Sequence, residues 1–201
     1  MADPPIRGRI LVVSPQPFYQ DRGTPIAVRQ VLQALSELGR AVDLLTYPVG
    51  MDVEIPGLRI FRSGNPLRLE SVPVGFSLRK LVLDLPLTSS LRTRLAQERY
   101  TCVHAVEEAA FPAALFARQH GVPLLYDMQS SLAEQLGALG PLSLGPTRRM
   151  LDAAERWLLE QADLVVTSAG LAPRVRAMVP EARVREWHFP SAPAGAAPAD
   201  V

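Results

Sequence analysis

The sequence predicts an α/β domain with a doubly wound, mainly parallel sheet and helices on both of its faces. Short runs rich in Val, Ile and Leu alternate with longer segments of helical periodicity between Arg9 and Trp187. The first of these runs is continuously apolar, which is typical of a strand covered on both faces. The connections between them are long enough for crossovers between parallel strands.

The N-terminal part is expected to form a strand, a helix and a second strand. Arg9–Ser14 is a continuous apolar run, and Pro25–Leu38 has apolar residues at helical spacing. Thr24 is placed to cap this helix and Gly39 to end it. Ala41–Tyr47 is the next apolar run, so the three segments predict a βαβ unit.

The rest of the chain continues the alternation. The expected elements are a strand at Leu58–Arg62, helices at Phe76–Leu85 and Thr88–Glu98 separated at Pro86, a strand at Tyr100–Ala105, a helix at Glu107–His120 ended by Gly121, a strand at Val122–Asp127, a helix at Thr147–Gln161, a strand at Leu164–Thr167, a helix at Ala172–Val179 and a strand at Ala182–Trp187. We expect residues 1–8 to be an N-terminal extension, residues 9–189 to form the domain, and the Pro- and Ala-rich residues 190–201 to be a tail or a severed linker.

Composition narrows the class of protein. A length of 201 residues with 48% hydrophobic residues suits one sizeable core. The formal net charge of +1 gives no reason to expect a nucleic-acid partner. The single cysteine, Cys102, cannot form an intrachain disulfide, so we expect a reducing, cytoplasmic compartment. No segment reaches the roughly 20 apolar residues of a membrane-spanning helix.

Four stretches resemble a known family, and each of them includes the end of an expected strand. They are Ser14–Val28, Tyr100–Glu108, Val122–Ser131 and Ala162–Ser168. The last three are similar to the family patterns D-V-I-H-x-H-x-E, P-x-V-x-D-x-H and A-D-x-V-I-x-x-S. On these stretches the chain resembles, over about residues 9–189, the N-terminal domain of family 4 glycosyltransferases.

The resemblance implies one Rossmann-like half of a GT-B fold, in which two such domains face each other across a cleft. It implies a retaining, bacterial-type glycosyltransferase with a nucleotide-sugar donor, no tightly bound cofactor and no metal requirement. This half would bind a sugar or lipid-linked acceptor, and a C-terminal domain or partner chain would bind the donor. The family's paired glutamates of the donor domain have no counterpart here, so we expect this chain alone to be incomplete.

The resemblance also implies a donor-phosphate loop at Gly23 and Thr24. Backbone N–H groups and the dipole at the start of a helix attract phosphate, so a glycine there suits a nucleotide sugar. The alternative interpretation is that Gly23 only permits a tight turn into the helix.

Two strand ends supply the candidate acceptor-binding residues, which are His104, Glu107, Glu108 and Ser130. The family usually has a second histidine where this chain has Val106, so His104 is expected to pack in the core or to satisfy a backbone group. Glu107 and Glu108 could bind acceptor hydroxyls, although acidic residues are also favoured in a first helical turn by the dipole alone.

No catalytic residue is assigned with assurance. Gln129 stands where the family typically has a histidine that contacts the transferred sugar, with Asp127 nearby. A glutamine can form hydrogen bonds but cannot titrate near neutral pH. Retaining transfer in this fold is thought to depend on support of the leaving diphosphate and on the position of the acceptor, so the replacement weakens the case for catalysis without excluding it.

Basic residues leave a membrane-peripheral location open. Arg79, Lys80, Arg92, Arg94 and Arg99 could form a basic face that rests on anionic lipid. An ordinary solvated face is the alternative interpretation, and it applies equally to Arg148, Arg149 and Arg156.

The sequence leaves three alternative functions open. The first is the acceptor half of a glycosyltransferase. The second is a non-catalytic module that binds carbohydrate or protein and keeps the fold without the chemistry. The third, a flavodoxin-like or response-regulator domain, fits the alternation of strands and helices but leaves the ordered motifs unexplained.

Overall fold

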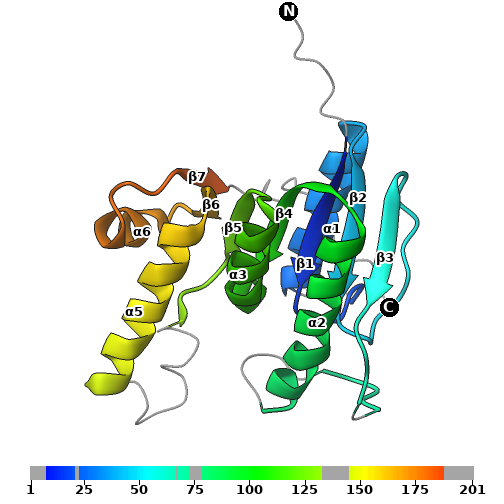
Figure 1. Cartoon of the computed structure of the whole chain (residues 1–201), viewed down its shortest axis with the longest axis horizontal. Coiled ribbons are helices and arrows are strands. Elements are labelled where there is room, and N and C mark those ends of the chain that lie inside the picture. Colours follow the sequence, from blue (N-terminus) through cyan, green and yellow to red (C-terminus); the bar gives the residue numbers. More distant parts are fainter. Residues whose placement is uncertain (1–7, 21–22, 67, 73–77, 133–144, 188–201) are drawn as a thin grey trace, which may run out of the picture.

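The computed structural model describes residues 8–20, 23–66, 68–72, 78–132 and 145–187, without the side chains of residues 78, 79 and 81. Seven strands form one sheet in the order β3-β2-β1-β4-β5-β6-β7, visible from right to left in Figure 1. Every pair of neighbouring strands in the described sheet is parallel. The predicted fold class is therefore confirmed. The strands are β1 (Arg9–Ser14), β2 (Ala41–Thr46), β3 (Leu58–Arg62), β4 (Tyr100–Val106), β5 (Leu124–Met128), β6 (Leu164–Ser168) and β7 (Val184–Trp187).

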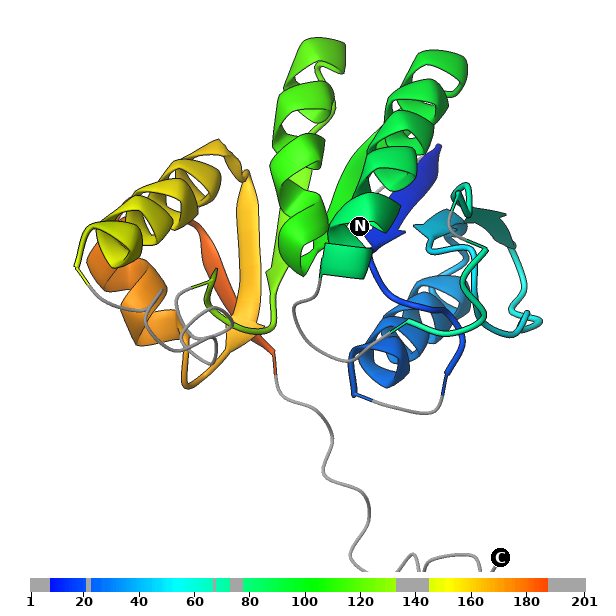
Figure 2. The same ribbon diagram turned by 90° about the horizontal axis from the view of Figure 1, so that it is seen from below.

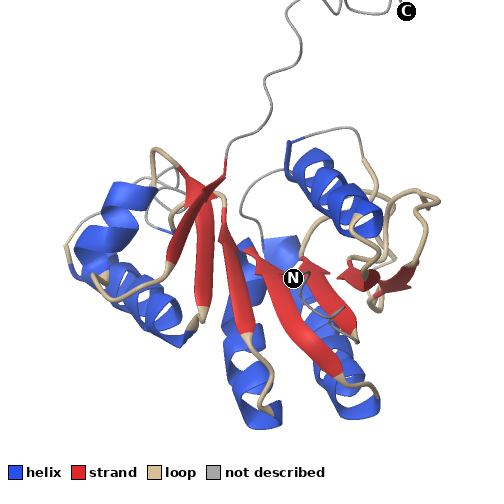
Figure 3. Ribbon diagram, turned by 90° about the horizontal axis from the view of Figure 1, so that it is seen from above, coloured by secondary structure: helices blue, strands red, loops and turns tan. Residues whose placement is uncertain are grey.

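Helices cover both faces of the sheet, as Figures 2 and 3 show. On one face, α1 (Gly23–Glu37) buries Val28 and Leu32 against β1 and β2. On the other face, α2 (Leu78–Gln97), α3 (Ala110–His120), α5 (Pro146–Gln161) and α6 (Ala172–Met178) contribute to the larger apolar cluster. The side of α3 toward the sheet consists of four buried alanines, whose small side chains let the helix pack closely.

Helix α2 corrects one prediction. Two helices separated at Pro86 were expected, but a single helix runs from Leu78 to Gln97 with Pro86 inside it. Proline removes one helical hydrogen bond. Burial on both sides of it compensates, because Leu83, Leu87 and Leu91 recur at every fourth position and are all buried in the same core.

Other boundaries moved by one to three residues. Helix α1 begins at Gly23, so Thr24 lies inside its first turn and not at the capping position. The expected helix at Glu107–His120 begins with a separate 3₁₀ turn, η1 (Glu107–Ala109). Gly121 ends α3 as predicted, with a left-handed φ of 64°, and the N–H of Val122 donates to the carbonyl of Ala117 at 2.9 Å. The predicted tail at residues 190–201 lies outside the described residues.

A buried carboxylate joins the four neighbouring strands β3, β2, β1 and β4. Asp43 on β2 is fully buried and accepts hydrogen bonds from Arg9 (2.6 Å), Arg59 (2.7 and 2.6 Å) and Tyr100 (2.8 Å). Burial by itself would raise the pKa of Asp43. The hydrogen bonds from Arg59, Tyr100 and Arg9 outweigh that effect and hold the pKa below its usual value of 3.8.

The topology fixes where a ligand can bind. From β1 the chain proceeds through β2 to β3 in one direction, and from β4 through to β7 in the other, so the order reverses between β1 and β4. Ligands of open parallel sheets bind beyond the carboxyl ends of the strands at such a reversal.

Candidate functional site

A carboxylate bridges the strand ends at this reversal. Glu107, which follows β4, accepts a hydrogen bond on Oε2 from Gln16 Nε2 at 3.1 Å and one on Oε1 from Ser130 Oγ at 3.0 Å. Gln16 follows β1 and Ser130 follows β5, so three loops meet on one side chain. Two of the predicted acceptor residues, Glu107 and Ser130, are thereby brought together.

The backbone and the carboxyl group of Glu107 are both in unfavourable states. Its φ of 49° lies in the left-handed region, which residues with a side chain seldom adopt. Burial and the neighbouring charge of Glu108 raise its pKa above the usual value of 4.5. Strain and a perturbed carboxyl at a strand end are typical of a ligand-binding position.

Glu108 lies in a second polar group next to Glu107. Its Oε1 is 2.9 Å from Lys80 Nζ on α2. The hydroxyl of Tyr47, which follows β2, donates to Asp84 on α2 at 2.5 Å. Burial raises the pKa of Asp84, and the charge of Glu108 adds to that effect. Among the described residues around Glu107, the acidic Glu107, Glu108 and Asp84 outnumber the basic Lys80, which favours ligands that donate hydrogen bonds.

Lys80 is a correction to the predicted basic face. It is only 8% exposed and is paired with Glu108, which follows β4. Arg94 stacks on the ring of Phe61 with its guanidinium carbon 4.4 Å from the ring centroid. The side chain of Arg79 lies outside the described residues. Lys80 and Arg94 thus have partners within the domain.

His104 is buried, as expected, but its partner is a side chain. Its Nε2 lies 3.2 Å from Asp127 Oδ2 on the neighbouring strand β5. His104 and Asp127 face α1, on the same side of the sheet as Val106, which is fully buried in the core. The residue in place of the family's second histidine therefore contributes packing.

Asp127 and Gln129 line a small pocket at the ends of β5, β6 and β7, which we call the edge pocket. Its volume is about 130 Å³. Complete small-molecule sites usually occupy roughly 300 Å³ or more, so this pocket is large enough for only part of a ligand. It is lined by Ala27, Val31, Asp127, Met128, Gln129, Thr167, Ser168 and Trp187.

Gly23 begins α1 beside the same edge of the sheet. Its φ is 23°, and a methyl group added at its Cα would meet no atom of the described residues within 4 Å. Packing therefore does not require a glycine there, whereas the backbone conformation favours one. The loop before it is held by Tyr19, whose N–H and carbonyl exchange hydrogen bonds with Met51 at 2.8 and 3.1 Å.

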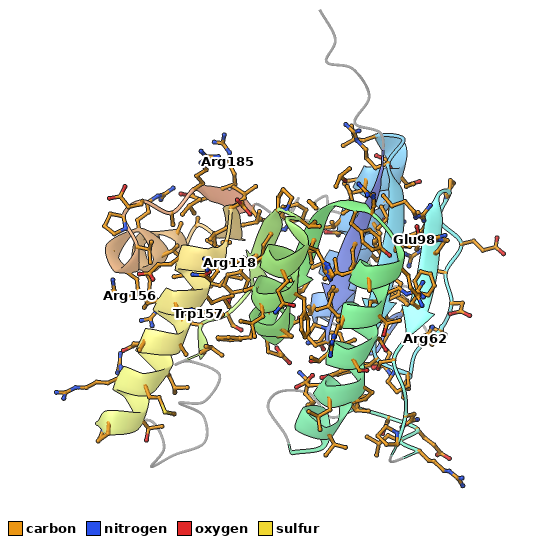
Figure 4. The ribbon with its side chains drawn as sticks, viewed as in Figure 1. Arg62, Glu98, Arg118, Arg156, Trp157 and Arg185 are labelled. Atoms are coloured by element: carbon orange, nitrogen blue, oxygen red, sulfur yellow. The ribbon has the colours of Figure 1, made fainter. Side chains whose placement is uncertain are left out.

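Two larger hollows lie away from this edge. One, of about 560 Å³, lies between α5 and α6 and is lined by Arg156, Trp157 and Arg174 among others; Figure 4 shows the first two on α5. The other, also about 560 Å³, lies at the amino ends of the strands near Glu98 and His120. The edge site, by which we mean Gln16, Glu107 and Ser130 together with the edge pocket, is the better candidate because it lies at the carboxyl ends of the strands, next to the topological reversal.

The sequence left several contributors unassigned. Gln16 and Tyr47 directly follow strands, so the rule that polar residues at strand ends bind ligands would have selected them. Asp84 and Lys80 could not be found in this way, because they lie on a helix whose orientation depends on tertiary packing.

The fold and the edge site define a parallel α/β domain that presents hydrogen-bonding side chains at a topological reversal. The chain belongs to the family of glycosyl transferase 4-like domains, whose model matches residues 22–188. The predicted family is thereby confirmed.

Solved structures share the fold. The chain is similar to sucrose-phosphate synthase from Thermosynechococcus elongatus, with 20% identity and a TM-score of 0.68 over 90% of this chain and 47% of that one. It is also similar to a UGT transferase from Siraitia grosvenorii in complex with UDP, with 11% identity and a TM-score of 0.59 over 88% of this chain and 50% of that one. The chain thus spans about half the length of these two structures. No curated protein sequence matches it significantly.

The described residues contain neither a membrane-spanning helix nor a cluster of metal ligands. Within the described part of the chain, no helix combines the length and the apolar character needed to cross a membrane. The same residues contain no group of three or more His, Cys, Asp and Glu side chains arranged to hold a metal ion.

Proposed function

We propose that the chain is the acceptor-binding half of a retaining glycosyltransferase that uses a nucleotide-sugar donor. A second, donor-binding domain or partner chain would complete its site. The main support is the meeting of Gln16, Glu107 and Ser130 at the reversal of the sheet, in a domain of this family. The edge pocket of about 130 Å³ supports the need for a second wall.

The chemistry of the side chains suits an acceptor with hydroxyl groups. An ionised Glu107 accepts hydrogen bonds and can orient a hydroxyl group, since charged acceptors bind more strongly than neutral ones. Gln129 can donate to or accept from the transferred sugar without exchanging a proton. Orientation alone can supply much of the rate enhancement of a transfer reaction.

The donor diphosphate would lie near Gly23 and Thr24 at the start of α1. Backbone N–H groups and the helix dipole stabilise negative charge there as the diphosphate leaves. Since α1 supplies this stabilisation, we propose that transfer requires no metal ion.

Assays of the chain alone and of a completed enzyme test this proposal. We expect the 201-residue chain to transfer no sugar from UDP- or GDP-sugars, and fusion to a donor-binding domain of the family to produce transfer with retained anomeric configuration, as measured by NMR of the product. Rapid turnover by the chain alone would contradict the two-wall site. An inverted product would contradict the retaining mechanism.

A non-catalytic binding module is the second candidate. It is favoured by Gln129, which lines the edge pocket in place of a titratable histidine. Calorimetry with glucose, mannose, N-acetylglucosamine and lipid-linked acceptors, on the wild type and on Gln129→His, separates the two functions. Binding that never leads to transfer in the fused enzyme, with or without the histidine, would favour the module.

A further inference from the structure

Glu155 on α5 is fully buried, an unusual location for a glutamate. Its Oε1 accepts a hydrogen bond from the backbone N–H of Leu132 at 3.0 Å. Its Oε2 accepts hydrogen bonds from Arg174, from Nη2 at 2.8 Å and from Nε at 3.3 Å. Arg174, on α6, also donates to Asp152 at 2.9 Å. A buried carboxylate is costly unless it is paired, and both of its oxygens here have partners.

The backbone that Glu155 holds is the segment that supplies the edge site. At the start of this segment, the carbonyl of Met128 accepts a hydrogen bond from the Thr167 hydroxyl at 2.7 Å. Ser130 donates to Glu107 in its middle, and Leu132 donates to Glu155 at its end. Residues 128–132 are thus held at three points by β6, by the end of β4 and by α5.

The contact to Glu155 sets the position of Ser130 along the chain. A slip by one residue moves a backbone atom by about 3.8 Å, which exceeds the tolerance of a hydrogen bond. Ser130 Oγ lies 3.0 Å from Glu107, so such a slip would break that bond. A hydrogen bond from a backbone N–H to an ionised carboxylate is stronger than a neutral one, which suits an anchor.

We propose that Glu155, braced by Arg174, is a positioning residue for the edge site. It fixes the end of the segment that carries Gln129 and Ser130, and so places Ser130 and Glu107 for the acceptor. The role in acceptor binding rests on the proposed function. The anchoring of the segment does not, and the two are measured separately.

Hydrogen exchange on the whole chain tests the anchoring. We expect Glu155→Ala to accelerate exchange of the Leu132 amide at least tenfold. The backbone amides of β1 and β2 should keep their wild-type exchange rates. Glu155→Gln retains the Oε1 acceptor and should restore most of the protection. Glu160→Gln, an exposed change on the same helix, is the matched control. Unchanged exchange at Leu132 in Glu155→Ala would overturn the proposal.

If Glu155→Ala fails to fold, Arg174→Gln tests the anchoring of Leu132 in its place. It removes the brace but leaves the acceptor, so we expect a two- to fivefold acceleration at Leu132 and none in β1. Equal acceleration at both places would show general destabilisation and would contradict local anchoring.

Calorimetry with glucose, mannose and N-acetylglucosamine tests the functional consequence. Glu155→Ala should weaken binding of the sugar that the wild type binds at least fivefold, and Glu155→Gln by less than twofold. In a Ser130→Ala background, Glu155→Ala should have little further effect, because both changes act on one contact. Additive effects would overturn positioning through Ser130. Absence of wild-type binding would contradict the proposed function and leave the exchange result to decide the anchoring.

Discussion

Glu107 has the strongest combination of strain, perturbed pKa and placement among the residues of the edge site. Its raised pKa means that the ionised form is disfavoured in the fold, so its charge is not retained for stability. We expect Glu107→Gln to leave the melting temperature unchanged or higher, and to weaken acceptor binding about tenfold, since a charge-assisted hydrogen bond is replaced by a neutral one. Thermal unfolding and calorimetry check the two outcomes, with Glu181→Gln as an exposed control.

The same carboxyl group predicts a pH dependence. Acceptor binding that needs ionised Glu107 should weaken as pH falls, and the midpoint should lie above the usual 4.5 because burial and Glu108 raise the pKa. Calorimetric titrations at several pH values measure this limb, which should disappear in Glu107→Gln. A limb that persists in this variant would assign the titration to another group.

A substitution of Gly23 can distinguish its two interpretations, which are a glycine needed only for the turn and a glycine that lets the donor diphosphate approach. A methyl group at this position meets no described atom within 4 Å, but the φ of 23° strains any residue with a side chain. We expect Gly23→Ala to cost about 1 kcal/mol of stability. In the fused enzyme, the KM for the nucleotide sugar should rise at least tenfold if the diphosphate approaches this backbone. A large loss of stability with an unchanged KM would support the turn-only interpretation.

Asp43 links residue chemistry to stability. Its pKa is lowered in the fold, so its contribution is complete above the unfolded-state value near 4 and is lost as pH falls through the lower folded-state value. Asp43→Asn removes the charged partner of Arg9 and one of the two charged partners of Arg59, which keeps Glu98, and should cost roughly 3 kcal/mol at pH 7. Urea unfolding at pH 7 and pH 3 should show a smaller difference between variant and wild type at pH 3.

At the scale of elements, α2 contains a residue that disfavours it. Pro86 removes a helical hydrogen bond, and its ring packs near Gly64. We expect Pro86→Ala to raise the free energy of unfolding by about 1 kcal/mol, less than the intrinsic difference of about 3 kcal/mol because some packing is lost. Leu87→Ala, one residue further, should lower it by about 3 kcal/mol. Denaturant unfolding of both variants measures these opposite effects.

The sequence predicted strands better than helix boundaries. Short runs of four to seven residues located all seven strands of the described sheet. The signal is clearest in β1, β2 and β4, because burial on both faces leaves a simple local pattern. Pro86 misled because its local preference was outweighed by leucines buried along the whole length of α2. The 3₁₀ turn at Glu107 was missed because it depends on contacts with Gln16 and Ser130, which lie far away in the sequence.

For the whole molecule, the sequence proposed candidate residues around the ends of β4 and β5 but not how they pair. His104 and Asp127 lie within the last residues of these strands, Glu107 and Ser130 follow them, and the structure brings the four together in two pairs. Glu155 was hidden within the apolar face of α5, where its position between Leu151 and Leu158 was the available signal. Its partner Leu132 could not be found without coordinates.

The proposed absence of a metal requirement can be tested on the fused enzyme. If α1 supplies the stabilisation of the leaving diphosphate, EDTA should change the transfer rate of the fused enzyme by less than twofold, and added Mg²⁺ should not restore a lost rate. Steady-state rates with and without chelator measure this. A tenfold loss that Mg²⁺ reverses would contradict the proposal.

The shared direction of all seven strands has a practical consequence for engineering. The segments that leave the sheet at one rim can be exchanged or lengthened while the apolar interior and the opposite rim keep their sequences. If the proposed function holds, libraries for altered acceptor preference can therefore be confined to the few positions that follow β1, β4 and β5.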